Sequence, residues 1–219
     1  MHGQTEGQPE PVLTRVWLLR HAETADPTVF HGAESDIGLS ERGQRLAEEL
    51  APWIAAQRPD CIYASGMRRA RDTAAPFART CGLPVQVEPD LYERRVGVLT
   101  RQPFHAFDGL WEETLRRWIA GETGFAPEGA ESFDEIQARV LPAWQRLTNR
   151  HAGQTLVVVA HGVVCKVLLT SLGVGFGIAD WKRLGSVENL GLHELVGGAG
   201  RWQLLRLNYR PPTHREPPA

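Results

Sequence analysis

The sequence predicts an α/β fold with a mostly parallel central sheet, and short apolar segments carry this prediction. The runs at 16–19, 60–64 and 155–160 are too short for ordinary helices and are typical of buried strands. The first two runs are each followed by a polar segment and then a helical pattern, which indicates strand–helix units of the same polarity. In open α/β sheets ligands bind beyond the carboxyl ends of the strands, so a site is expected where these runs end.

Turn and cap residues place the boundaries of the other elements. Ser40 is a favoured N-cap residue, and the apolar residues that follow it recur at helical spacing. Gly82 is suited to end the second helix, while Ser132 and Glu135 form a capping box at the start of a later one. The expected elements are a strand at 16–19, a loop at 24–39, a helix from Ser40, a strand at 60–64, a helix at 68–80, a strand at 83–87, helices at about 104–120 and 132–148, a strand at 155–160, a helix at 163–172, and a hairpin of strands at 192–196 and 202–207.

One domain is predicted at 12–208, with a helical insertion at about 94–150 that packs over one edge of the sheet and is a candidate lid. The segments at 1–11 and 209–219 are rich in proline and polar residues, and we expect them to be disordered tails.

Composition limits the classes of partner. The chain has 219 residues and a net charge of −2 with both signs interspersed, which excludes the basic footprint of a dedicated nucleic-acid binder. Three widely spaced cysteines, Cys61, Cys81 and Cys165, build neither a disulfide framework nor a CxxC metal pattern. No apolar run reaches the roughly 18 residues of a membrane span, and the N-terminus lacks a secretory signal pattern. We therefore expect a cytoplasmic protein with no membrane partner.

Charged and imidazole side chains follow three of the strands. Arg20 and His21 end the first strand, His161 ends the strand at 155–160, and Arg68 and Arg69 follow the strand at 60–64. In one parallel sheet these ends converge, which brings two imidazoles and at least two guanidiniums into one pocket. Guanidiniums match phosphate oxygens, and a neutral imidazole is a competent nucleophile, so the pattern predicts a phosphate site that needs no metal.

Four motifs, in order and spacing, resemble those of the histidine phosphatase superfamily, the phosphoglycerate-mutase-like fold, over about residues 15–208. They are Arg20-His21-Ala22-Glu23, the Ser-x-Met-x-Arg-Ala-x-x-Thr-Ala pattern at 65–74, Leu91-Tyr92-Glu93-Arg94 and His161-Gly162. The resemblance implies a three-layer α/β/α sandwich with a helical insertion. It also implies that His21 is the phosphorylated nucleophile and that Glu93 is the general acid. Arg20, Arg69, His161 and Gly162 would bind the phosphoryl group, and His161 would also take part in catalysis.

Further residues are candidates for contacts with the rest of the substrate: Thr28, Arg68 and Arg94. Arg69 rather than Arg68 matches the phosphate-binding position because Ala70 follows it, so Arg68 is expected to face solvent or an outer phosphate. Glu23 is expected to be structural. Four other histidines, His31, His105, His151 and His193, are expected to be surface or hydrogen-bonded residues.

Two segments depart from the family pattern. Ala22 stands where glycine is common, which would cost about 1 kcal/mol or more if the backbone there required a positive φ. The segment 98–101 lacks the Trp-Glu-Gly that is common in phosphatases. We therefore expect the rim of the pocket to differ from that of other members, so the substrate does not follow from the resemblance.

Three functions remain open, and the first is favoured. The protein is expected to be a phosphatase that acts on a small phosphorylated metabolite without a cofactor or metal. The segment 127–132 resembles a stretch of the phosphatases, whereas the sequence of 91–95 is closer to that of the cofactor-dependent phosphoglycerate mutases. The third hypothesis is a non-catalytic protein that binds a phosphorylated ligand. The sequence leaves open whether the protein forms a homodimer.

Overall fold

The computed structural model describes residues 12–103 and 108–212. The expectations for 1–11, 213–219, His105 and the start of the helix at 104 lie outside the described residues. Tyr209, expected to begin a tail, instead ends the last strand. No helix in the described ranges is both long and apolar enough to cross a membrane.

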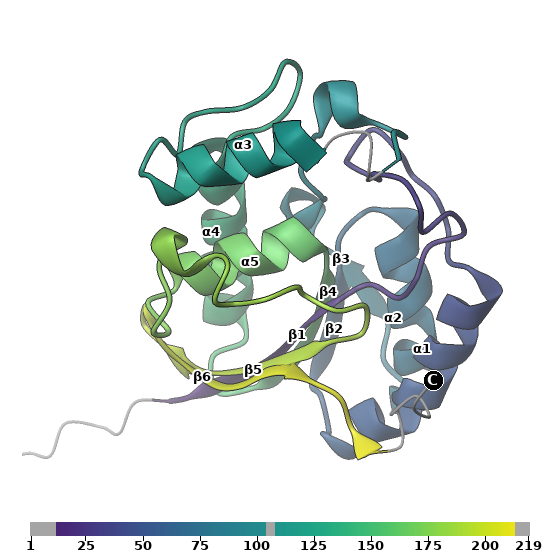
Figure 1. Ribbon diagram of the computed structural model, residues 1–219. Helices are drawn as coiled ribbons and strands as arrows, with labels where there is room; N and C mark the ends of the chain where they lie inside the picture. The colour runs from purple at the N-terminus through teal and green to yellow at the C-terminus, as the bar shows by residue number, and fades with distance from the viewer. Residues whose placement is uncertain (1–11, 104–107, 213–219) are drawn as a thin grey trace, which may run out of the picture.

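The strands form one mixed sheet in the order β3-β2-β4-β1-β5-β6 (Figure 1). β1, β2, β3 and β4 are mutually parallel, whereas β5 runs antiparallel to β1 and forms a hairpin with β6. The predicted mostly parallel sheet and C-terminal hairpin are therefore confirmed. The strands are β1 (Thr14–Arg20), β2 (Cys61–Ala64), β3 (Val85–Val87), β4 (Thr155–Ala160), β5 (Leu192–Gly198) and β6 (Arg201–Tyr209).

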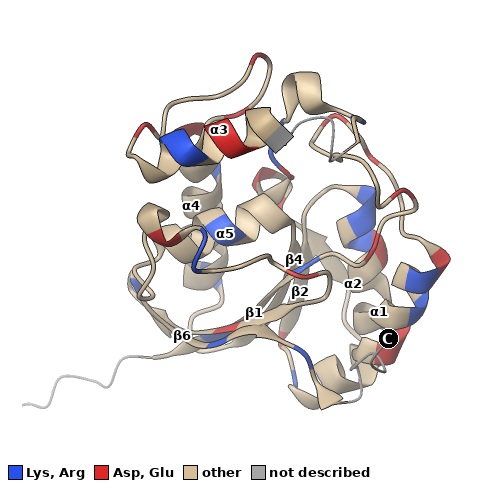
Figure 2. Ribbon diagram, viewed as in Figure 1, with Lys and Arg blue, Asp and Glu red and all other residues tan. Residues whose placement is uncertain are grey.

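Helices cover both faces of the sheet, as the predicted three-layer α/β/α sandwich requires (Figure 1). They are α1 (Glu41–Ala56), α2 (Arg68–Cys81), α3 (Asp108–Ile119), α4 (Phe133–Arg150) and α5 (Gly162–Ser171). The Ser40 side chain caps α1, Gly82 ends α2 at a φ of 68°, and Ser132 and Glu135 form the predicted capping box of α4. α1 and α3 each carry both acidic and basic residues (Figure 2).

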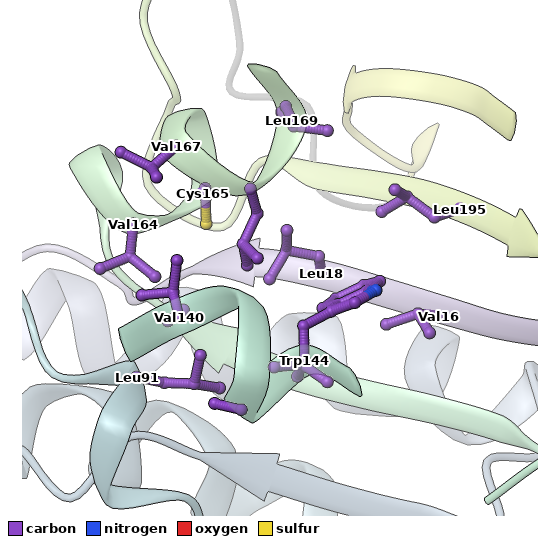
Figure 3. Packing of buried hydrophobic residues seen from close by; sticks show 14 of the residues in the cluster. Val16, Leu18, Leu91, Val140, Trp144, Val164, Cys165, Val167, Leu169 and Leu195 are labelled. Atoms are coloured by element: carbon purple, nitrogen blue, oxygen red, sulfur yellow. The ribbon is translucent and has the colours of Figure 1, made fainter. Parts of the chain in front are cut away.

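Alternation along β1 divides the core in two. Trp17 and Leu19 face α1 and α2, whereas Val16 and Leu18 face α4 and α5. Figure 3 shows the second core, in which Trp144 of α4 packs near β1 together with residues of α5. Burial on both faces explains why β1 and β4 are continuous apolar runs in the sequence.

The segment expected as an insertion over one sheet edge divides into two parts. α3 lies beyond α5 on the side away from the sheet, where Trp118 meets the rings of Phe133 and Trp181 (Figure 1). α4 instead packs on the sheet face and shares a core with β1, β4 and α5. α4 is therefore part of the framework, and only the region of α3 lies in the position of a lid.

Candidate active site

The carboxyl ends of three neighbouring parallel strands bring the predicted residues together. β1 lies next to β4, and β4 lies next to β2. His21 follows β1 and His161 follows β4, and their ring centroids are 5.1 Å apart. Ser65 follows β2, and its Oγ lies 2.6 Å from Nε2 of His161. The predicted convergence of strand ends is thus present.

The backbone around His21 fixes the orientation and tautomer of its ring. Nδ1 lies 2.7 Å from the carbonyl oxygen of Ala22, which can only accept, so Nδ1 carries the proton and Nε2 keeps a lone pair. The Ala22 N–H donates to Thr73 Oγ1, and Nδ2 of Asn189 donates to the His21 carbonyl. Ala22 is not among the residues with positive φ, so alanine causes no backbone strain here.

The surroundings keep both imidazoles neutral. Burial, followed by the positive charges of Arg69 and Arg20, holds the pKa of His21 well below its ordinary value. Burial and the charge of Arg69 likewise lower the pKa of His161. An unprotonated Nε2 on His21 is the form that can attack phosphorus.

Backbone carbonyls hold the two guanidiniums in place. Arg69 is fully buried, and its Nη1 donates to the Ser35 carbonyl at 2.8 Å while Nη2 donates to the carbonyls of His31 and Gly32. Nη1 of Arg20 donates to the Val187 carbonyl at 2.9 Å. Among the described residues, neither guanidinium forms an ion pair with a carboxylate, so both are positioned by neutral acceptors.

Three buried nitrogen atoms of residues that act on His21 lack a hydrogen-bond partner in the described part of the chain. They are Nε of Arg20, Nε of Arg69 and Nδ1 of His161. Buried polar groups are normally satisfied, and each exception calls for an explanation. Donors that converge beside a nucleophile are suited to the oxygens of a phosphoryl group.

Glu93 is buried beside this group. Its Oε1 accepts from the Arg94 N–H at 2.8 Å, and its Oε2 lies 3.5 Å from the Val163 nitrogen in the first turn of α5. The backbone N–H of Glu93 points at Sδ of Met67. The carboxyl group thus reaches the cavity from a fixed main chain.

A buried ion pair anchors the segment that carries Glu93. Glu131 accepts from Nε and Nη2 of Arg139 at 2.9 and 3.0 Å and from the Arg95 N–H at 2.8 Å. Nη1 of Arg139 donates to the carbonyls of Asp90 and Tyr92. This clamp, defined as Glu131 with Arg139, holds both sides of Glu93.

One cavity of about 380 Å³ contains the reactive groups. Of the predicted residues, its lining includes Arg20, His21, Glu93, Arg94 and Gly162, whereas Arg69 and His161 are fully buried and do not line it.

Two candidate substrate residues lie elsewhere. Thr28 is exposed and bonded to Asp26, although its neighbours Pro27 and Val29 line the cavity. Arg68 is exposed, pairs with Asp72, and lines a separate surface hollow. The structure does not bring these two side chains to the cavity.

The side chains expected to be structural have partners. Glu23 lines the cavity, but its two oxygens accept from Ser40 Oγ and Arg42 Nη1. His31 and His151 use both ring nitrogens, whereas His193 accepts through Nδ1 and its Nε2 has no partner among the described residues. Within the described ranges, no group of three His, Cys, Asp or Glu residues could hold a metal ion.

A model of the histidine phosphatase superfamily (branch 1) matches residues 16–210. The chain belongs to this family. Over 173 residues it is 34% identical to the metal-independent phosphoserine phosphatase of Arabidopsis thaliana, a match that covers 73% of this chain and 68% of that protein. It is 32% identical over 162 residues to a probable phosphoglycerate mutase of Yersinia enterocolitica, covering 73% of this chain and 75% of that one.

The fold of this histidine phosphatase is similar to solved structures. A mycobacterial glucosyl-3-phosphoglycerate phosphatase aligns with a TM-score of 0.79 and 28% identity, over 90% of this chain and 100% of that chain. The family resemblance and fold class predicted from the motifs are therefore confirmed.

Sequence reasoning missed several residues that support the site of this histidine phosphatase. Ser65 and Thr73 stand in the motif at 65–74, so their spacing was a usable signal for contacts with His161 and Ala22. Glu131 lies in the phosphatase-like segment 127–132, but its partner Arg139 had no signal. Asn189 and Lys166, which also line the cavity, had none.

Proposed function

We propose that this histidine phosphatase hydrolyses small phosphomonoesters through a phosphohistidine on His21, with no metal or cofactor. The observation that carries the proposal is the ring of His21. Its Nδ1 is bonded to the Ala22 carbonyl and its Nε2 keeps a lone pair, while Nε of Arg20, Nε of Arg69 and Nδ1 of His161, all from residues close to it, have no partner within the described residues.

In the first half of the reaction, Nε2 of His21 attacks the phosphorus and the bond to the ester oxygen breaks. Arg20, Arg69 and His161 stabilise the charge on the phosphoryl oxygens. Glu93 in its acid form gives its proton to the departing oxygen, so the alcohol leaves neutral.

In the second half, the Glu93 carboxylate takes a proton from water. The water oxygen bonds to phosphorus, and the bond between phosphorus and Nε2 breaks. The products are inorganic phosphate and neutral His21, and Glu93 is again protonated. Arg20 and Arg69 stay charged throughout because no acidic group pairs with either at ion-pair distance among the described residues.

The first test compares wild type with His21→Ala and a control, His151→Gln, on p-nitrophenyl phosphate. His151 lies outside the cavity, bonded to Tyr63 and Gln154. We expect turnover with a chelator present in wild type and control, and a loss of at least about 10³-fold in His21→Ala. Activity that survives His21→Ala, or that requires a divalent metal, contradicts the proposal, as does the absence of turnover in wild type, which would leave a ligand-binding role.

The intermediate can be trapped directly. Rapid denaturation during turnover of a labelled substrate should leave phosphate on the wild-type protein in an acid-labile, base-stable linkage, and none on His21→Ala. Label found on a serine or carboxylate would exclude the nucleophile named here.

The mutase alternative predicts isomerisation instead of hydrolysis. Incubation with 3-phosphoglycerate should release phosphate from a phosphatase and form 2-phosphoglycerate with a mutase. Support for hydrolysis comes from the segment around Arg116 and Arg117. The cofactor-dependent mutases carry a pair of arginines followed by a proline-rich run here, whereas no such run follows this pair, and each arginine is bound to a surface glutamate, Arg116 to Glu113 and Arg117 to Glu122. Neither arginine lines the cavity.

A further inference from the structure

Two cations that line the cavity have no role in the proposed reaction. The charged lining residues are Arg20, Glu23, Glu93, Arg94 and Lys166. Arg20 and Glu93 serve the phosphoryl group, and Glu23 is bound to Ser40 and Arg42. Arg94 and Lys166 remain.

Arg94 is a buried guanidinium with unpaired donors. It is 1% exposed, and its Nε and Nη1 have no hydrogen-bond partner in the described part of the chain. The ring of Trp111 lies 4.4 Å from the guanidinium carbon and that of Trp118 lies 5.5 Å from it. Burial lowers the pKa of Arg94 to about 10, so the group still carries its charge near neutral pH. The carboxylates of Glu93, Glu131 and Glu34 offset part of the cost of burying this charge, but its two unpaired donors remain costly unless a ligand satisfies them.

Lys166 is the basic residue of α5 (Figure 2). Its Nζ lies 4.7 Å from the Trp181 ring centroid, and among the described residues it forms no ion pair. α5 also supplies Gly162 and Val163 to the cavity, so its first turns place Lys166 on the same wall as the phosphoryl site.

These two cations lie where the cavity continues outward. Trp111, Val163 and Lys166 line both the cavity and an adjoining groove of about 370 Å³, whereas His21 and Arg20 line only the cavity. Trp111 also packs against Arg94. The part of a substrate that extends from the phosphoryl group toward the groove therefore passes Arg94 and Lys166.

We propose that Arg94 and Lys166 bind a carboxylate on the alcohol part of the substrate, so that the preferred substrates are carboxylated phosphomonoesters. The rings of Trp111 and Trp118 lie against the guanidinium, which leaves its in-plane N–H groups for the ligand. A planar carboxylate takes two parallel hydrogen bonds from one edge of a guanidinium, either Nε with Nη2 or Nη1 with Nη2, and each of these edges of Arg94 holds one of the two unpaired donors. The inference rests on the proposed phosphatase activity and adds the substrate class to it.

The test uses substrate pairs that differ in the carboxylate. O-Phosphoserine is compared with O-phosphoethanolamine, and 3-phosphoglycerate with glycerol 3-phosphate. We expect wild type to favour the carboxylated member by about tenfold or more in kcat/KM, as for a charge-assisted contact. Glycerol 1,3-bisphosphate distinguishes a carboxylate site from a site for a second phosphate.

Two variants assign the preference to these side chains. Lys166→Met and Arg94→Lys should each bring the ratio of kcat/KM between the carboxylated substrate and its counterpart without the carboxylate closer to one. Lys166→Met removes a cation, and Arg94→Lys removes the pair of N–H donors that can bind both carboxylate oxygens. Arg150→Met, which removes a cation from the exposed end of α4, should leave the ratio unchanged. Lys166 is only half-buried, so Lys166→Met decides the matter if Arg94→Lys fails to fold.

The outcomes separate the two proposals. Absence of p-nitrophenyl phosphate turnover in wild type defeats the phosphatase function itself. Turnover with equal kcat/KM within each pair, or a ratio unchanged in Lys166→Met, overturns the carboxylate site and leaves the phosphatase intact. A preference for the bisphosphate over 3-phosphoglycerate also overturns the carboxylate assignment.

Discussion

Removal of the charge of Glu131 should disturb both stability and the acid step. In Glu131→Gln the side chain keeps its shape, but one oxygen becomes an NH₂ that faces N–H donors. Burial raises the pKa of Glu131, but hydrogen bonds and the charge of Arg139 outweigh this effect and leave it below its ordinary value. The native protein therefore holds a charged carboxylate here, 2% exposed.

The loss of stability in Glu131→Gln depends on which contacts Arg139 keeps. Removing one partner of a buried ion pair typically costs about 3–5 kcal/mol, and we expect a cost at the lower end, about 3 kcal/mol, because Arg139 keeps the carbonyls of Asp90 and Tyr92 as acceptors. The free energy of unfolding, measured by urea denaturation, should fall by this amount. The control Glu122→Gln breaks an exposed pair with Arg117 and should change it by less than about 0.5 kcal/mol.

A purely structural role and a positioning role give different kinetics. If the clamp positions Glu93, kcat for alkyl phosphates should fall about tenfold more than kcat for p-nitrophenyl phosphate, whose leaving group departs without a proton. Equal losses on both substrates, or a loss of stability below about 1 kcal/mol, would refute the reasoning.

Three further effects follow from single contacts. Ser65→Ala leaves both ring nitrogens of buried His161 unpaired among the described residues and should lower kcat/KM about tenfold. Ser65→Thr keeps the hydroxyl and should partly restore kcat/KM, so steady-state kinetics of the two variants tests the contact. Gly97→Ala puts a Cβ 2.1 Å from the Glu128 carbonyl oxygen at a φ of 54° and should lower the midpoint of thermal unfolding, whereas an unchanged midpoint contradicts the contact. Burial lowers the pKa of His193 to about 4, so below about pH 6.5 the unfolded chain takes up a proton that the folded protein does not. Stability should therefore decrease by about 2 kcal/mol from this group between pH 7.5 and pH 5, and the decrease should be smaller in His193→Gln when denaturation is measured at both pH values.

The parts of the fold that were predictable from the sequence depend on local patterns. Continuous apolar runs identify β1 and β4 because both strands are buried on two faces. The two strands run parallel, so the residues that follow them, His21 and His161, lie at the same edge of the sheet. The position of α4 was not predictable in this way. An amphipathic helix shows which face is buried but not what buries it, so its place on the sheet rather than over an edge required the tertiary structure.

The site was predictable where a motif spans it and obscure where contacts are long-range. Arg20 and Glu93 stand in short motifs, whereas Asn189 reaches the His21 carbonyl from 168 residues away. Thr28 lies in a loop next to two residues that line the cavity, and only the backbone path decides which side chain points inward. Proximity in sequence is thus a weak guide within irregular segments.

The central place of β1 in the sheet has a consequence for synthesis of the protein. β1 leaves the ribosome before the two strands that it pairs with, β4 and β5, as Arg15 lies opposite Thr155 and Val196. Both neighbours are translated much later, so this apolar strand waits with open edges while most of the chain is made. Such delayed, non-local pairing favours slow maturation and a need for chaperone protection of the nascent polypeptide.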